Sequence, residues 1–409
     1  MRFWGITGTN GKTTTTWITA EFINADPARK CGYVTTVEVN TGSRQFYTGY
    51  TTPPLAQLKE IFAEMEANGC TDCVMEVSSH AIHQHRTGDT VFSGGVFTNL
   101  SEDHLDYHKT MEAYFDVKLD FARQIAAAHP ATPSMGRRDL PPYVVCLDGG
   151  YGRKMLGAVG NLAVNVIPVS IKSAKAKGEG EQQNVACPAV GPGPLHFDLS
   201  DLQLVGDYNK SNVLCAAALA EAAGVERGRI QAVIPTLKPR WGRLEEVKSK
   251  SGKVKSRVFV DFAHTPDGLE KVLAAARGFT PEGKRLWVVF GAGGDRDPMK
   301  RPLMGEACAK LADRLVVTSD NPRSEDPLKI IEAIKAGIVR CSPSSSGFAF
   351  TVEPDRKQAI EFALREAQEG DVVIIAGKGH ETTQEIKGVK YPFDDREVVR
   401  NFVDAPKST

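Results

Sequence analysis

Two patterns of apolar and polar residues alternate along the chain. A short apolar run at 2–7, RFWGIT, is followed by a stretch with helical spacing from about Lys12 to Asn24. This alternation is typical of βαβ units, in which helices cover a mainly parallel sheet. The sequence therefore predicts an α/β fold. The same pattern predicts further strands at 73–77, 94–99, 143–148 and 164–171, and further helices at 112–128 and 211–223.

A second βα series follows the polar segment LKPRWGRLEE at 237–246, which we interpret as a hinge. The apolar runs of this series end in Gly, Asp or Asn, and ligands of open α/β sheets bind at that carboxyl edge. We therefore expect a boundary near Arg240, with one domain at 1–240 and another at 241–409. The four runs lie at 257–264, 286–294, 315–322 and 371–379.

Two segments interrupt the pattern, at 129–142 and at 173–194. Both are rich in proline, glycine or charged residues. We expect exposed loops or insertions there rather than parts of a core.

Composition narrows the range of functions. The chain has 409 residues, a length that favours two or three domains, and its 50 Lys and Arg balance its 50 Asp and Glu. This balance argues against a nucleic-acid binder that depends on bulk positive charge. The sequence contains no run of eighteen apolar residues and no apolar leader, so we expect a cytoplasmic protein without a membrane segment.

Eight cysteines are scattered along the chain, and only Cys70 and Cys73 form a CxxC pair. A second pair at zinc-ribbon spacing is missing. A metal or redox role is therefore less well supported than two cysteines entering a buried strand.

A glycine-rich turn with a lysine follows the first predicted strand and opens the first predicted helix. Backbone N–H groups of such a turn and the helix N-terminus bind phosphates, Lys12 can reach the β and γ phosphates, and the Thr13 hydroxyl can bind Mg²⁺. The spacing GxxGKT is shorter than the usual GxxxxGK[ST], and the alternative is a glycine-rich helix cap. The candidate nucleotide-binding residues are Gly8, Thr9, Asn10, Gly11, Lys12, Thr13 and Thr14.

Further candidates lie at the ends of the next strands. Glu76 could share a magnesium ion with the phosphates, and Lys118 lies in the middle of a helix among apolar neighbours. Each has an ordinary alternative as a helix-dipole partner or a surface lysine. The segment FTNLSEDHLDYH adds Asn99, Asp103, His104, Asp106 and His108.

Taken together, these motifs resemble those of the Mur ligases of peptidoglycan synthesis, and most of all their diaminopimelate-adding members. The motifs occur in the family's order across essentially the whole chain. They are TGTNGKTT, TTP, MEVSSH, FTNLSEDHLDYH, YFDVKLDF, YNKSN, RWGRLE, VDFAHTPDGL, FGAGGDRDPMKRPLMG, DNPRSEDP, GKGHE and FDDRE. The resemblance implies a central ATPase domain and a C-terminal Rossmann-like domain.

The resemblance also implies roles for individual residues. Thr13, Glu76 and His104 would hold two Mg²⁺ ions, and Lys118 would carry a carbamate derived from CO₂, which turns a buried cation into an anion that can bind metal. From the hinge and the C-terminal domain, nucleotide contacts are implied for Asn209 or Asn212, Arg243, Asp261 and His264. The acceptor, a nucleotide-sugar dipeptide, would be held by Thr51, Thr52, Ser78, Gln84 and Arg86.

The pocket for the incoming amino acid is implied at Arg296, Asn321, Arg323, Gly377 and Glu381. Arg323 could grip the distal carboxylate of meso-diaminopimelate through two N–H groups, and Glu381 could pair with its distal ammonium. Lysine has no distal carboxylate, so the motif DNPR favours diaminopimelate.

Two features depart from the family pattern. Mur ligases carry about a hundred residues before the ATP loop, which bind the UDP part of the acceptor, and here Met1 stands just ahead of Gly8. We therefore expect a lost start, an acceptor without UDP or a partner chain that supplies this domain; otherwise we expect a monomer. The second departure is Phe262, where the family commonly has tyrosine.

The sequence thus predicts an ATP-dependent amide ligase that acts on small molecules through an acyl phosphate. Two alternatives stay open. One is a ligase similar to folylpolyglutamate synthetases that uses an acceptor without UDP. The other is a nucleotide-binding subunit without catalytic activity.

Overall fold

The structure is a computed structural model that describes residues 1–132, 134–171, 197–250, 254–341 and 349–402. The predicted loop at 173–194 lies outside these residues. The chain forms two compact units. The first comprises Met1–Ser101 and His108–Leu237, and the second comprises Glu102–Tyr107 and the chain from Lys238 onward.

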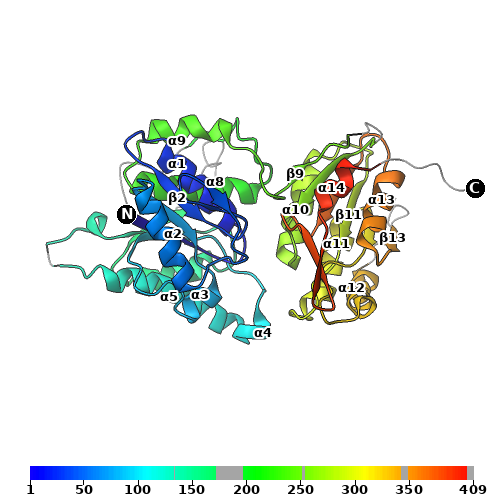
Figure 1. The fold of residues 1–409 in the computed structure, drawn as a ribbon, viewed down its shortest axis with the longest axis horizontal. Coiled ribbons are helices and arrows are strands. Elements are labelled where there is room, and N and C mark those ends of the chain that lie inside the picture. Colours follow the sequence, from blue (N-terminus) through cyan, green and yellow to red (C-terminus); the bar gives the residue numbers. More distant parts are fainter. Residues whose placement is uncertain (133, 172–196, 251–253, 342–348, 403–409) are drawn as a thin grey trace, which may run out of the picture. The chain divides into compact units, whose positions relative to one another are not determined.

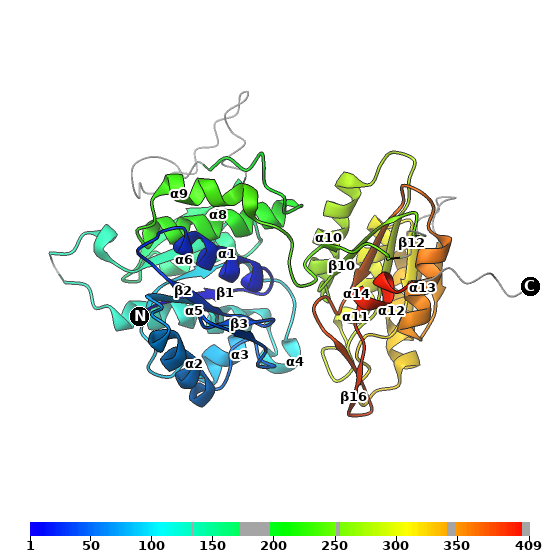
Figure 2. The same ribbon diagram turned by 45° about the horizontal axis from the view of Figure 1, so that its top comes forward.

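The first unit is built on an eight-stranded sheet (Figures 1 and 2). Its strand order is β4-β3-β2-β5-β1-β6-β7-β8, and all neighbours are parallel except the β2–β3 and β3–β4 pairs. The predicted mainly parallel sheet is confirmed. The strands are β1 (Arg2–Thr7), β2 (Cys31–Val34), β3 (Val39–Asn40), β4 (Gln45–Phe46), β5 (Asp72–Glu76), β6 (Phe92–Phe97), β7 (Pro142–Cys146) and β8 (Asn165–Val169).

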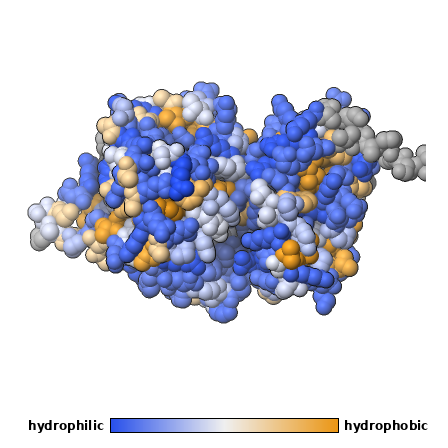
Figure 3. All heavy atoms as spheres, viewed as in Figure 1, coloured by the Kyte–Doolittle hydropathy of each residue, from blue (hydrophilic) through white to orange (hydrophobic). Residues whose placement is uncertain are grey.

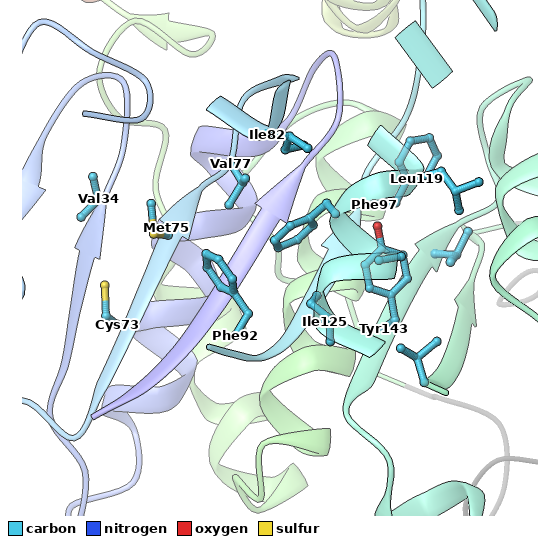
Figure 4. Packing of buried hydrophobic residues seen from close by; sticks show 14 of the residues in the cluster. Val34, Cys73, Met75, Val77, Ile82, Phe92, Phe97, Leu119, Ile125 and Tyr143 are labelled. Atoms are coloured by element: carbon cyan, nitrogen blue, oxygen red, sulfur yellow. The ribbon is translucent and has the colours of Figure 1, made fainter. Parts of the chain in front are cut away.

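Helices cover both faces of this sheet. One face packs against α2 (Leu55–Ala67), α5 (Met111–Ala128) and α6 (Gly152–Val159), and the other against α1 (Lys12–Asn24) and α8 (Asp207–Ala222). Figure 4 shows the first of these layers, where Phe97, Leu119 and Tyr143 interdigitate. The remaining helical elements of this unit are α3 (Ser79–His83), η1 (Arg137–Asp139), α9 (Arg227–Val233) and η2 (Ile234–Thr236). The short helix α4 (Leu105–His108) lies mostly in the segment Glu102–Tyr107 of the second unit.

The second unit contains a six-stranded sheet in the order β13-β12-β11-β14-β10-β9. All neighbours are parallel except β9 and β10. Because β14 lies between β10 and β11, the carboxyl ends of these strands meet where the strand order reverses, which is where α/β sheets bind ligands. The strands are β9 (Glu245–Glu246), β10 (Arg257–Asp261), β11 (Leu286–Phe290), β12 (Arg314–Val317), β13 (Ala349–Val352) and β14 (Val372–Ala376).

Two helical layers enclose this second sheet. The helices α10 (Pro266–Phe279), α11 (Lys300–Leu311) and α12 (Pro327–Cys341) cover one face. The helices α13 (Arg356–Glu366) and α14 (Asp395–Arg400) cover the other. A separate antiparallel hairpin of β15 (Thr383–Ile386) and β16 (Val389–Pro392) follows β14. No helix in the described residues has both the length and the apolar character needed to cross a membrane.

Hydrophilic side chains cover most of the face shown in Figure 3, and apolar ones are scattered among them. On the β15–β16 hairpin, Val389 and Tyr391 are about half exposed. Isolated apolar side chains of this kind are ordinary on a protein surface.

Candidate functional site

The predicted phosphate loop joins the carboxyl end of β1 to the first turn of α1. The helix begins at Lys12 without a side-chain cap and without an acidic residue in its first turn, so its N-terminus favours an anion. Gly11 has φ +84°, and a Cβ there would lie 2.4 Å from Asn212 Oδ1. Only glycine fits this position. The loop is anchored by Thr98 Oγ1 and Asn99 Nδ2, which both donate to Asn10 O.

The side chains of Lys12 and Thr13 lie along this loop. Lys12 Nζ donates to Gly8 O (3.0 Å) and Thr9 O (2.8 Å), so its charge is held at the turn. Thr13 Oγ1 donates to Glu76 Oε1 (2.8 Å). The structure thus brings the loop and the predicted acidic residue of β5 together.

Glu76 is 1% exposed and is held by three donors. Besides Thr13, both the backbone N–H and the hydroxyl of Thr36 contact its carboxylate, at 2.7 and 3.1 Å. Sequence reasoning missed Thr36, because its position depends on β2 lying beside β5. A carboxylate and a hydroxyl are the hard oxygen ligands that Mg²⁺ prefers, so Thr13 and Glu76 fit a magnesium ion shared with phosphate oxygens. Within the described residues, no group of three or more His, Cys, Asp or Glu side chains is placed so that it could hold a metal ion.

Lys118 reaches the phosphate loop from α5. Its side chain is 1% exposed, and Nζ donates to Gly8 O (3.0 Å) and lies 3.4 Å from Thr7 Oγ1. Nζ also lies 4.9 Å from the centre of the Tyr114 ring, whose hydroxyl is 3.2 Å from Thr9 Oγ1. The lysine is therefore buried at the loop, and the interpretation of Lys118 as a surface lysine is wrong.

The residues implied for the acceptor cluster at the end of β5. Thr52 is buried, donates to Glu76 O (2.9 Å) and accepts from Ser78 N (3.1 Å). Arg86 donates to Thr52 O (3.3 Å) and to Gln84 Oε1 (2.8 Å). Thr51 Oγ1 lies 3.0 Å from Thr36 Oγ1.

Of the two asparagines on α8, Asn212 lies directly at the phosphate loop. Its Oδ1 lies beside Gly11 and accepts from Thr15 Oγ1 at 3.3 Å. Asn209 lies one helical turn away, and its Oδ1 is 3.4 Å from Asn212 Nδ2. We therefore assign the direct loop contact to Asn212 and a supporting position to Asn209.

His104 belongs to the second unit, in the segment Glu102–Tyr107. Its backbone N–H donates to Asp103 Oδ1 (3.0 Å), and its Nε2 lies 3.5 Å from Asp103 Oδ2. Asp103 also lies 3.6 Å from Lys300 Nζ, a residue that sequence reasoning did not select. Burial acts to raise the pKa of Asp103, but the charges of Lys300, His104 and His264 outweigh burial and hold this pKa below its ordinary range.

The candidates near the carboxyl end of β10 also lie together. Asp261 accepts from Leu244 N (2.6 Å) and Ala263 N (2.7 Å), and burial raises its pKa against the opposing charge of Arg243. The Arg243 guanidinium lies 4.6 Å from the centre of the Phe262 ring. This distance allows a cation–π interaction between the guanidinium and the phenyl ring. His264 Nδ1 lies 2.8 Å from Phe262 O.

A glycine contact ties the hinge to the GKGHE segment. Gly242 has φ +60°, and a Cβ there would lie 2.2 Å from the carbonyl carbon of Gly379. The two backbones therefore approach as closely as glycines allow.

The implied amino-acid residues converge at the ends of β11, β12 and β14. Asn321 Nδ2 donates to Glu381 Oε2 (2.8 Å), and Arg323 Nη1 donates to Gly294 O (2.6 Å). Gly377 follows β14 directly and lies beside Asp320. Arg296 is exposed and makes no hydrogen bond or ion pair within the described residues.

The β15–β16 hairpin holds the backbone of Arg323. Arg323 N donates to Glu385 O (3.0 Å), and Lys387 N donates to Arg323 O (2.6 Å). Arg323 has φ +52°, an unfavourable conformation for a residue with a Cβ. The hairpin bonds therefore fix the position from which its guanidinium extends.

Comparisons with known proteins cover nearly the whole chain. Residues 6–220 match the Mur ligase middle domain, and residues 242–379 match the Mur ligase, glutamate ligase domain. The chain is 39% identical over 405 residues to the UDP-N-acetylmuramoyl-L-alanyl-D-glutamate--2,6-diaminopimelate ligase of Geobacillus kaustophilus (strain HTA426), covering 98% of this chain and 78% of that protein. It is also 39% identical over 416 residues to the protein of the same name from Synechococcus elongatus, covering 98% of this chain and 76% of that protein.

Solved structures extend the comparison. A structure of a UDP-N-acetylmuramoyl-L-alanyl-D-glutamate--2,6-diaminopimelate ligase has 32% identity and a TM-score of 0.58, covering 98% of this chain and 77% of that chain. A folylpolyglutamate synthase of Mycobacterium tuberculosis, 19% identical with a TM-score of 0.59, covers 92% of this chain and 88% of its own, and shares the fold. With both domain models matched and identity near 40% across nearly the whole chain, the protein belongs to the Mur ligase family of ATP-dependent ligases.

Proposed function

We propose that this Mur ligase joins meso-diaminopimelate to UDP-N-acetylmuramoyl-L-alanyl-D-glutamate, or to a UDP-free analogue, in peptidoglycan synthesis. The observation that supports this proposal is the placement of three implied residues after neighbouring strands: Asn321 and Arg323 follow β12, and Glu381, which accepts from Asn321 Nδ2 at 2.8 Å, follows β14. A guanidinium and a carboxylate match an amino acid whose distal end carries both a carboxylate and an ammonium. The similarity to diaminopimelate ligases supports the same substrate.

The reaction follows from the groups at the phosphate loop. The acceptor carboxylate attacks the γ phosphorus of ATP, which gives an acyl phosphate and ADP, and the amine then attacks the carbonyl carbon and releases phosphate. We assign binding of the β and γ phosphates to Lys12 and the loop N–H groups. The acceptor is oriented by the residues around Thr52 and Arg86. Nothing in this scheme requires a covalent enzyme intermediate.

Magnesium would be held by Thr13 and Glu76 and would neutralise charge on the phosphates; His104 is proposed as a further ligand on the family resemblance alone. We propose that Lys118 carries a carbamate that holds the second ion. The burial of Lys118 beside Gly8 supports a position at the phosphates, and Thr7 and Gly8 would orient the modified side chain. We assign nucleotide contacts to Asn212, Asn209, Arg243, Asp261 and His264.

We also propose that residues 1–240 act as the ATP-binding domain and residues 241–409 as the amino-acid domain. The family matches support this division. Because the reaction consumes ATP, we assign it to the cytoplasm.

The test measures ADP release and product mass with purified protein, ATP and Mg²⁺. UDP-N-acetylmuramoyl-L-alanyl-D-glutamate and the UDP-free muramoyl dipeptide serve as acceptors, and meso-diaminopimelate, L-lysine and L-glutamate as amino acids. We expect ADP release that requires both an acceptor and meso-diaminopimelate, with a product of the summed mass less one water. Equal rates with all three amino acids would refute the assigned substrate.

A further inference from the structure

Lys378 is a lysine whose side chain is entirely buried, in the loop that follows β14. Its Nζ lies 3.0 Å from Asn321 Oδ1, 2.9 Å from Glu381 Oε2 and 3.7 Å from Asp320 Oδ1. An ammonium group without such partners would be costly to bury. Lys378 therefore belongs to a polar network, and two members of that network are residues of the amino-acid pocket.

The network fixes how the Asn321 amide is oriented. Lys378 Nζ and Glu385 N both donate to Asn321 Oδ1, each at 3.0 Å. The opposite end of the amide, Nδ2, then points to Glu381 Oε2 at 2.8 Å. A flipped amide would place its N–H₂ group against the ammonium and lose these bonds.

The same network orients the Glu381 carboxylate. Oε2 accepts from both Lys378 and Asn321, while Oε1 accepts no hydrogen bond within the described residues. The Glu381 side chain is about one-third exposed. One carboxylate oxygen is therefore fixed inside the protein, and the other remains available to a ligand.

A second buried cation near the same loop differs in its partners. Arg356 donates to both carboxylate oxygens of Asp395, at 2.8 Å each, and to Ala376 O and Ser319 O. None of these partners is a candidate pocket residue. Arg356 thus ties α13 to α14, whereas Lys378 bonds to the side chains that would face the amino acid.

We propose that Lys378 is a positioning residue for the amino-acid substrate, because it locks the Asn321 amide and aims one oxygen of Glu381 at the substrate ammonium. This inference rests on the proposed function. Without Lys378, the carboxylates of Asp320 and Glu381 would lose the cation between them, and the Asn321 amide could turn. The pocket would then bind the amino acid less tightly, while ATP binding at the phosphate loop would be unaffected.

The kinetic test compares Lys378→Met with the wild type. We expect KM for meso-diaminopimelate to rise at least tenfold while KM for ATP stays within twofold. Lys378→Arg should restore part of the loss because it keeps a cationic donor. Arg356→Lys is the matched control: its melting temperature should fall with an unchanged KM for diaminopimelate. An unchanged KM in Lys378→Met, or an equal rise for ATP and diaminopimelate, would overturn the proposal.

A double-mutant cycle with Glu381→Gln tests whether Lys378 acts through Glu381. Because Lys378 also holds the Asn321 amide, we expect the double variant to lose more binding of diaminopimelate than Glu381→Gln alone but less than the product of the two single losses; losses that multiply would contradict this. Crystal structures of the wild type and Lys378→Met give a readout besides activity. If the Asn321 amide and the Glu381 carboxylate keep their positions in the variant, the positioning role is refuted. This structural result is independent of activity, so it can be told apart from failure of the proposed function, which would appear as a wild type inactive with diaminopimelate.

Discussion

Replacing Arg323 by alanine tests the assigned substrate most directly. The guanidinium side chain is 22% exposed, with Nη1 on Gly294 O at 2.6 Å and Nε 3.6 Å from Glu385 Oε2. Nη1 has a second N–H, and Nη2 makes no hydrogen bond within the described residues, so this edge of the fork can receive a carboxylate. Alanine keeps a Cβ at φ +52°, so the substitution leaves the backbone strain unchanged.

The expected loss follows from this geometry. A desolvated bidentate pair is worth about 2 to 5 kcal/mol, and partial exposure of Arg323 places it near the lower end, at about 2 to 3 kcal/mol. Since 1.4 kcal/mol corresponds to a factor of ten, kcat/KM for meso-diaminopimelate should fall about 30- to 150-fold. L-Lysine has no distal carboxylate, so its kcat/KM should change less than about threefold on the same reasoning.

Initial rates of ADP release with each amino acid, at saturating ATP and acceptor, measure this preference. Arg340→Ala is the matched control, because Arg340 is exposed and pairs with Glu306 outside the pocket. It should leave both rates unchanged. If Arg323→Ala lowers the rates with the two amino acids by the same factor, the argument from the distal carboxylate is refuted.

Three further substitutions test other parts of the structure. Lys118→Ala should lower ADP release at least a hundredfold, with partial rescue by bicarbonate and a short carboxylic acid; near wild-type rates would exclude Lys118 from the reaction. Gly242→Ala should lower the free energy of unfolding in urea by more than about 2 kcal/mol, because its Cβ would overlap the facing backbone. The control Gly283→Ala, at φ +74° with open space around it, should lower this free energy by about 1 kcal/mol. Equal losses in the two variants would contradict the close contact at Gly242. Burial and nearby cations lower the pKa of His380 to about 3. Between about pH 6.5 and pH 3, His380 is therefore protonated in the unfolded chain but neutral in the folded protein, so the free energy of unfolding falls as the pH drops through this range. His380→Gln should remove this loss, up to about 3 kcal/mol at pH 4.5, when urea unfolding is compared at pH 7.5 and 4.5; an unchanged pH dependence would refute the assignment.

The local pattern predicted the elements around the phosphate loop well. The run at 2–7 and the helix from Lys12 to Asn24 have the bounds of β1 and α1. The strand predicted at 94–99 corresponds to β6, which ends earlier than expected, at Phe97. It ends there because the side chains of Thr98 and Asn99 donate hydrogen bonds to the phosphate loop. Strand ends shift where a side chain gains a bond outside the sheet.

Contacts between segments that are distant along the chain could not be predicted from the sequence. Thr36 lies on Glu76 because β2 pairs with β5, and Lys378 meets Asn321 because β14 inserts beside β11. The β15–β16 hairpin turns at Lys387 and Gly388, which both have positive φ. Lysine is not among the residues that usually signal such a turn, so the sequence shows no clear pattern for the β15–β16 hairpin that holds the backbone of Arg323.

The contact between Gly242 and Gly379 links the segment that follows Leu237 to the loop of the amino-acid site. The chain leaves the first unit at Leu237, and from Gly242 onward it is pinned to the second unit's own backbone. Residues 238–241 are therefore the only residues between the first unit and this contact along the chain. Gly379 belongs to the loop that carries Glu381, so a side chain at position 242 would displace the loop that holds a residue of the amino-acid site.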